Sequence, residues 1–226
     1  MNEIKHTSYK MRNFRKTCLL LAVIFAVTIV HAQTYRLEAG FVSPKQHGDG
    51  FSTTYFNGIR LGATAEFNLK HNFSLLTGAL YSVVYSNKVQ NYSTSDSVIY
   101  KTFGHFLDIP LRLTYTLPIA KNLKVFAFAG PNLNIGLAQQ QKIQADLSNT
   151  WSAYTGITSV NYGDNDLYKN ALISRINFQM GAGGGVQWKN YQLKGGYDFG
   201  INSINKIDTN KILYQSGWYV SLVYQF

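Results

Sequence analysis

Few residues in this chain could do acid–base, nucleophilic or metal chemistry, and they lie far apart. His47, His71 and His105 fall in different segments without the spacing of metal ligands, and the chain has one cysteine, Cys18. A histidine beside a serine could hydrolyse an ester, but no acid is clearly aligned with His105 and the candidate serines. Those serines are Ser82, Ser86 and Ser174. We therefore expect no catalytic residue, no metal site and no cofactor.

Two short motifs fit ordinary structure better than ligand binding. Asp164 and Asp166 could hold calcium in a loop, but no glutamate follows at the EF-hand spacing, so turn chemistry is expected. The glycines of 181–185 lack the helix and the Lys-Ser/Thr pair that complete a phosphate loop. Close backbone packing explains this glycine run better than phosphate binding does.

Charged residues of both signs form the third candidate group, and they suit a buried network of ion pairs. Charged residues make up only 14% of the chain, against roughly 25% in an ordinary soluble domain. Mixed charges with interspersed glycines can fill a narrow interior when they pair and hydrogen bond. The candidates are Arg36, Glu38, Arg60, Glu66, Asp108, Arg112, Arg175, Lys194 and Asp198.

The elements that must position these charges are β-strands, because apolar residues recur with period two. In the segment 58–70, Ile59, Leu61 and Phe67 fall on one face, while Arg60 and Glu66 fall on the other. A tilted strand needs about 9 to 11 residues to cross a bilayer, and ordinary strands average about five or six. The eight expected strands are long enough to cross, and they cover 35–43, 58–70, 73–85, 107–117, 123–137, 172–188, 191–201 and 218–226.

The N-terminus predicts export. Basic residues at 12–16 precede an apolar run at 19–30, and Val30-His31-Ala32 is a small-x-small cleavage pattern. We expect a secretory signal peptide over 1–32 and one β-barrel domain over 33–226, with an uncleaved membrane anchor as the alternative. Cys18 would be removed with the leader. No basic cluster remains after that removal, so nucleic acid is not an expected partner.

The connections alternate in length. The segments 70–72, 118–122 and 189–190 are short, whereas 44–57, 86–102, 138–171 and 203–215 are long and polar. Outer-membrane barrels have short periplasmic turns and long outer loops. The fold class is therefore all-β, an eight-stranded antiparallel transmembrane β-barrel of up-and-down topology, with a lumen filled by polar and charged side chains.

The apolar faces carry almost no charge and are expected to meet lipid. An aromatic girdle is expected near the short turns. A soluble barrel with an apolar core, such as a lipocalin, is the alternative. The expected girdle comprises Tyr35, Phe67, Phe73, Tyr115, Trp188, Tyr191 and Phe226.

Several segments resemble the outer-membrane β-barrel domain of Bacteroidetes, the "porin family" or PorT-like proteins. These are 75–82 (LLTGALYS), 106–113 (FLDIPLRL), 128–131 (FAGP) and the glycines of 181–185. The resemblance covers about 33–226. It implies an eight-stranded barrel in the cell outer membrane and an accessory role in secretion across the envelope. It transfers no functional residue.

Pro110 breaks ordinary strand rules, because proline cannot donate to the ladder. We expect a bulge or kink there, with Asp108 and Arg112 flanking it inside the lumen.

The expected function is a non-enzymatic structural or interaction barrel; the alternatives are a narrow passive pore for ions or small solutes and, remotely, a lipid-modifying enzyme. The expected partners are outer-membrane lipid or lipopolysaccharide, the barrel-insertion machinery through the terminal strand ending in Phe226, and an envelope protein at 138–171.

Overall fold

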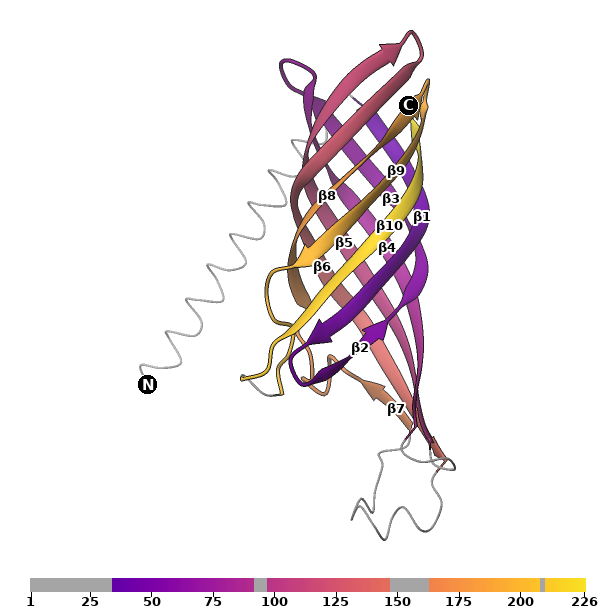
Figure 1. The fold of residues 1–226 in the computed structure, drawn as a ribbon, viewed down its shortest axis with the longest axis vertical. Helices are drawn as coiled ribbons and strands as arrows, with labels where there is room; N and C mark the ends of the chain where they lie inside the picture. The colour runs from indigo at the N-terminus through magenta and orange to yellow at the C-terminus, as the bar shows by residue number, and fades with distance from the viewer. Residues whose placement is uncertain (1–33, 92–96, 147–162, 208–209) are drawn as a thin grey trace, which may run out of the picture.

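The computed structural model describes residues 34–91, 97–146, 163–207 and 210–226 (Figure 1). The predicted signal peptide and the middle of the 138–171 connection lie outside the described residues. The described part contains no helix that is long and apolar enough to cross a membrane.

The strands form one closed, tilted cylinder (Figure 1). Neighbouring strands pair antiparallel in the order β10-β9-β8-β6-β5-β4-β3-β1, and pairing of β1 with β10 closes the ring. The eight-stranded antiparallel barrel predicted from the sequence is confirmed. The ring strands are β1 (Thr34–Gly48), β3 (Asn57–Asn68), β4 (Phe73–Asn91), β5 (Ser97–Ala120), β6 (Leu123–Asp146), β8 (Ile176–Trp188), β9 (Tyr191–Gly200) and β10 (Leu213–Gln225). Two short strands, β2 (Phe51–Tyr55) and β7 (Gly163–Asp166), pair with β1 and β6 outside the ring.

Side chains alternate between the outside and the interior along each strand. In β9, Tyr191 and Leu193 are exposed, whereas Gln192 and Lys194 are buried. The exposed sides are apolar, as the 67% exposure of Leu222 illustrates. The lipocalin-like alternative is therefore wrong. β9 is the shortest strand of the ring with 10 residues, and such a strand tilted by roughly 40° rises about 25 Å, the height of a membrane-facing band.

The long connections are shorter than predicted, because the strands continue past the membrane-facing band. β4 runs to Asn91 and β5 begins at Ser97, so most of 86–102 is an extended hairpin. Similarly, β6 continues to Asp146, and β7 pairs with it inside the predicted 138–171 loop. Outside the membrane the outward face of a strand meets water in place of lipid, so it no longer has to be apolar. The contrast between apolar and polar positions then disappears from the sequence although the strand persists.

The short turns are tied to one another around one rim of the barrel. Each contains an asparagine whose carbonyl oxygen accepts a hydrogen bond from the backbone of the next hairpin or strand. The left-handed φ angles of His71 (58°), Asn72 (66°) and Lys189 (51°) allow these tight reversals. The backbone N–H of Thr116 donates to the backbone carbonyl of Asn72 at 3.0 Å, that of Lys189 to Asn122 at 3.0 Å and that of Gln225 to Asn190 at 2.8 Å.

Of the bulge or kink predicted at Pro110, the bulge is absent, while Asp108 and Arg112 are buried in the interior as predicted. The pairs Pro110↔Asn132 and Leu113↔Ala129 keep one register, so no residue is inserted there. The missing N–H is instead accommodated by a gap in the β4–β5 ladder, between Thr77↔Leu111 and Leu80↔Asp108. The register shift in this region lies between His105 and Phe106.

Candidate functional site in the barrel interior

The middle of the interior is organised around the carboxylate of Glu38 on β1. This side chain lies at an inward position of the strand, and its residue is only 2% exposed. Arg60 of β3 donates to Glu38 Oε1 at 2.7 Å, and Lys194 of β9 contacts Oε2. The guanidinium carbon of Arg60 also lies 3.9 Å from the centre of the Tyr219 ring. One carboxylate therefore compensates two buried cations from two other strands.

A second ion pair lies nearer the short turns. Arg36 contacts Glu66, and Ser74 donates to the same carboxylate. Beyond this pair the barrel mouth widens into a polar cavity of about 340 Å³, lined in part by Asn68 and Gln187. The interior is thus open to solvent at this mouth and closed by the Arg36–Glu66 pair below it.

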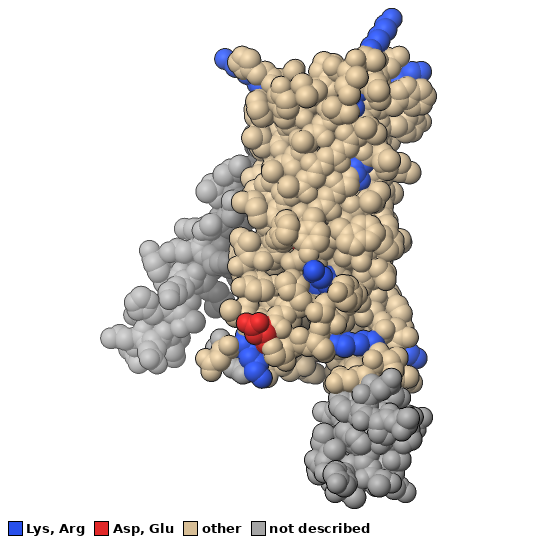
Figure 2. Space-filling view, in the orientation of Figure 1, with Lys and Arg blue, Asp and Glu red and all other residues tan. Residues whose placement is uncertain are grey.

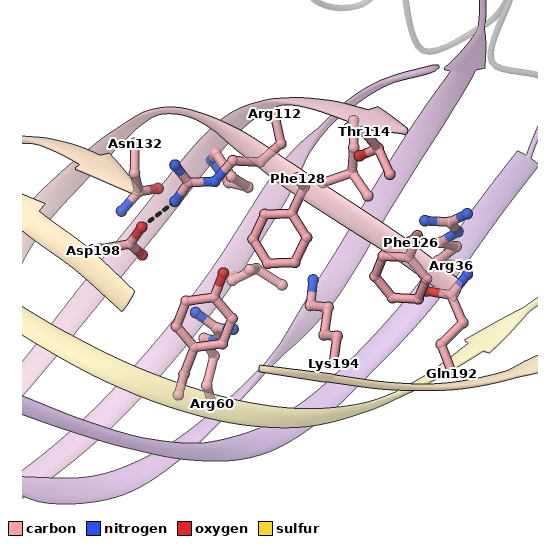
Figure 3. A pocket seen from close by; sticks show the side chains of 14 residues that line it. Arg36, Arg60, Arg112, Thr114, Phe126, Phe128, Asn132, Gln192, Lys194 and Asp198 are labelled. Carbon is pink, nitrogen blue, oxygen red and sulfur yellow. Dashed lines mark hydrogen bonds and ion pairs between the residues drawn. The ribbon is translucent and has the colours of Figure 1, made fainter. Parts of the chain in front are cut away.

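A third ion pair and a cluster of amides fill the half toward the long connections. Arg112 of β5 pairs with Asp198 of β9, drawn as the dashed contact in Figure 3. Asp108 has no cation in direct contact in the described part; it accepts instead from Asn132 at 2.8 Å and Asn134 at 2.9 Å. The cluster continues through side-chain bonds from Asn132 to Gln179 (2.7 Å), from Gln215 to Asn134 (3.0 Å) and from Gln46 to Gln215 (2.9 Å).

The buried charges balance. Four cations and four carboxylates are buried in the described interior, so their formal sum is zero. Unpaired buried charges are costly, whereas paired and hydrogen-bonded ones are tolerated. The cations are Arg36, Arg60, Arg112 and Lys194, and the carboxylates are Glu38, Glu66, Asp108 and Asp198.

Aromatic rings also fill the interior, and the sequence analysis did not anticipate them. Phe126 and Phe128 point inward from β6, with ring centres 6.4 Å apart. Glycines of β8 make room for them: a Cβ built on Gly185 would lie 2.6 Å from the Phe126 ring, and Gly183 faces Phe128. A signal was present, because both rings share a face with Lys124 rather than with the apolar positions of β6. Both rings belong to a buried apolar cluster that comprises Val42, Phe56, Val84, Phe106, Phe126, Phe128 and Tyr219.

Little space remains between these side chains. The cavity that Figure 3 shows, around Phe128 and Lys194, measures about 20 Å³, and a neighbouring one beside Asp108 measures about 50 Å³. One water needs roughly 10–15 Å³ of such volume. The two cavities therefore hold a few waters at most.

Arg175 does not belong to the interior, and its predicted place in the lumen is wrong. It precedes β8, which begins at Ile176, so the inward–outward alternation of that strand does not reach it. Its side chain is exposed and donates to the carbonyl of Leu137 at 2.6 Å. Its guanidinium carbon lies 4.6 Å from the centre of the Tyr168 ring. Arg175 thus links β6 to Tyr168 in the turn that follows β7.

The seven candidate girdle residues lie near the short-turn rim. Phe73 and Tyr115 are in ring contact at 4.8 Å, and Trp188 is paired with Tyr191 across the β8–β9 hairpin. Phe67 is half-buried, while the other six are exposed: Tyr35, Phe73, Tyr115, Trp188, Tyr191 and Phe226.

A second group of outward rings lies toward the long connections, and the sequence analysis missed it. Its pairs are Phe41–Trp218 at 5.4 Å, Phe103–His105 at 5.0 Å and Tyr197–Phe199 at 4.4 Å. Figure 2 shows the broad uncharged surface between the ends, with most basic side chains near them.

The other residues considered for catalysis or metal binding form structural contacts. His105 Nδ1 lies 2.5 Å from the Tyr81 hydroxyl, while Ser82 and Ser86 are buried on the interior side of β4. Asp166 accepts from the backbone N–H groups of Lys169 and Tyr168, and these bonds, that of Lys169 foremost, lower its pKa. No group of three potential metal ligands occurs among the described residues.

Comparison with known proteins adds family information. Residues 30–206 match the family model described as outer membrane protein beta-barrel domain. No curated protein matches the chain. Similar solved structures include Ail, the attachment invasion locus protein of Yersinia pestis (12% identity, 85% of this chain and 98% of Ail, TM-score 0.37). Neisserial surface protein A is also similar (13% identity, 85% of this chain and 97% of that protein, TM-score 0.44). So is the outer membrane enzyme PagL (12% identity, 82% of this chain and 98% of PagL, TM-score 0.36).

Proposed function

Because this chain belongs to the outer membrane protein beta-barrel domain family, we propose that it is a closed structural and interaction barrel of the outer membrane, neither a pore nor an enzyme. The observation that carries the proposal is the filled interior. Below the open mouth, the ion pairs, the amide cluster and the inward rings leave cavities of only about 20 and 50 Å³.

The proposed interaction surface is the sheet that projects past the ring. β5 and β6 each have 24 residues, more than twice the length of β9, and β4 and β7 flank their far ends (Figure 1). Projecting edges of this kind can pair with another protein. We propose an envelope protein as the partner, and the resemblance to PorT-like proteins supports an accessory role in secretion.

Planar bilayer recording tests the closed interior. We expect the purified barrel to give no steady current, because the ion pairs and rings occupy its cross-section. The double variant Phe126→Ala/Phe128→Ala is expected to conduct, since both rings face glycines and nothing else fills their space. The matched control, Phe103→Ala/Phe178→Ala, removes two outward rings and should stay silent. Steady channels from the unaltered protein would refute the closed barrel in favour of the pore.

The orientation is tested by cysteine labelling of whole cells. Residues 33–226 contain no cysteine, so a single one can be introduced without background. Lys142→Cys, on the projecting part of β6, should react with a membrane-impermeant maleimide on intact cells. Lys121→Cys, in a short turn, should react only after the outer membrane is permeabilised. The reverse pattern would show that the short turns face outward.

A further inference from the structure

Two lysines stand directly opposite each other on the outward side of the projecting sheet. Lys101 of β5 pairs in register with Lys142 of β6, and the same rung continues to Asn87 of β4 on one side and to Asp164 of β7 on the other. Asn87 and Phe103 share this face of the sheet and are exposed, so the face points outward. Like charges opposite one another on a sheet repel and destabilise the pair. The arrangement therefore favours an anion beside the two ammonium groups.

Among the carboxylates whose side chains the structure describes, none forms a salt bridge with Lys101 or Lys142. On β7, Asp166 Oδ1 accepts from the backbone of its own turn, and Oδ2 lies 3.8 Å from Lys169 Nζ. Asp164 lies opposite Lys142 in the β6–β7 register, so any test of the site must separate its contribution.

The lysine pair sits at the edge of the lipid-facing band. The next rung toward the membrane holds Tyr85 and Phe103, which are exposed, and the one after it holds His105. Rings of this kind mark the interface between hydrocarbon and headgroups. Ammonium groups one rung farther out lie at the depth of headgroup phosphates, and their stems can lie along the apolar surface.

We propose that Lys101 and Lys142 bind a phosphate of the glycolipid in the outer leaflet of the outer membrane. Two ammonium groups on adjacent strands can contact one phosphate together, and the phosphate removes their mutual repulsion. The proposal rests on the orientation given above, which cysteine labelling tests on its own, and it does not depend on whether the interior conducts.

Native mass spectrometry of the detergent-purified barrel, titrated with bisphosphorylated lipid A, tests the site. The variant Lys101→Gln/Lys142→Gln should bind about thirty-fold more weakly, at roughly 1 kcal/mol for each lysine near a lipid phosphate. The matched control Lys121→Gln/Lys189→Gln removes the same charge from the short turns and should bind like the unaltered protein. Dephosphorylated lipid A should bind the unaltered protein as weakly as the double variant binds lipid A.

Several results would overturn the site. These are an unchanged affinity in the double variant, an equal loss in the control, or phosphatidylglycerol binding as tightly as lipid A, which would indicate a site for any anionic lipid. The variant Asp164→Asn tests whether the carboxylate opposite Lys142 takes part in lipid A binding. Equal or tighter binding supports the phosphate site, whereas weaker binding would mean that the carboxylate itself contributes to recognition.

Discussion

Replacing Glu38 with glutamine is expected to lower the free energy of unfolding by about 3–5 kcal/mol, the cost of leaving buried charge without its partner. Glutamine keeps the shape but removes the charge that holds both Arg60 and Lys194. Urea unfolding of the barrel in lipid vesicles, followed by tryptophan fluorescence and by heat-modifiable gel mobility, measures the change.

A second substitution in the same cluster provides the control. Adding Lys194→Gln to Glu38→Gln removes one of the two orphaned cations, so the double variant should be more stable than Glu38→Gln alone. Additive losses, or a cost below about 1 kcal/mol for Glu38→Gln, would show that the interior tolerates the charge through water and that the cluster is not a packing element.

Replacing Leu111 with arginine is expected to cost about 2–4 kcal/mol, whereas the same change at Leu117 should cost about 0–1 kcal/mol. Both leucines lie on the outward face of β5, and each is 45% exposed. They differ in depth, because Leu117 lies past Tyr115 toward the short turn while Leu111 lies between the two groups of rings. Arginine at Leu111 must enter hydrocarbon, and at Leu117 it reaches headgroups and water.

The same vesicle unfolding assay reads both variants. Equal and small costs at the two positions would mean that this face meets water, and the lipid-facing assignment would fail. Equal and large costs would place the hydrocarbon boundary beyond Leu117, nearer the rim than the girdle residue Tyr115 indicates.

The barrel itself could be derived from the sequence because a membrane constrains backbone and side chains together. Every backbone polar group must be paired within the sheet, so a chain whose strands alternate across a bilayer has to close on itself. Alternation then assigns each residue to lipid or interior, which placed Glu38 and Lys194 on one side and Leu111 and Leu222 on the other. The same rule failed at Arg175, because that residue precedes the first residue of β8.

The extent of the strands was not predictable by the same reasoning. Beyond the membrane the outward face of the hairpin of β4 and β5 meets water in place of lipid, and its inward positions Ser86 and Thr102 are buried polar residues. The apolar–polar alternation was therefore lost from the sequence while the backbone kept pairing. Because the sequence did not reveal these strand extensions, the pairing of Lys101 with Lys142 became visible only in the strand register.

The sequence by itself determined the eight membrane-crossing strands, and, apart from Arg175 and the inward rings of β6, their faces and the charges to be buried, because period two separates the two faces of a strand. Only the tertiary structure decided which charges meet. Closure of the ring and the stagger of its strands bring Glu38 of β1 between Arg60 of β3 and Lys194 of β9, and they set Phe126 and Phe128 against the glycines of β8. Pairing across strands depends on that stagger, which no single strand encodes.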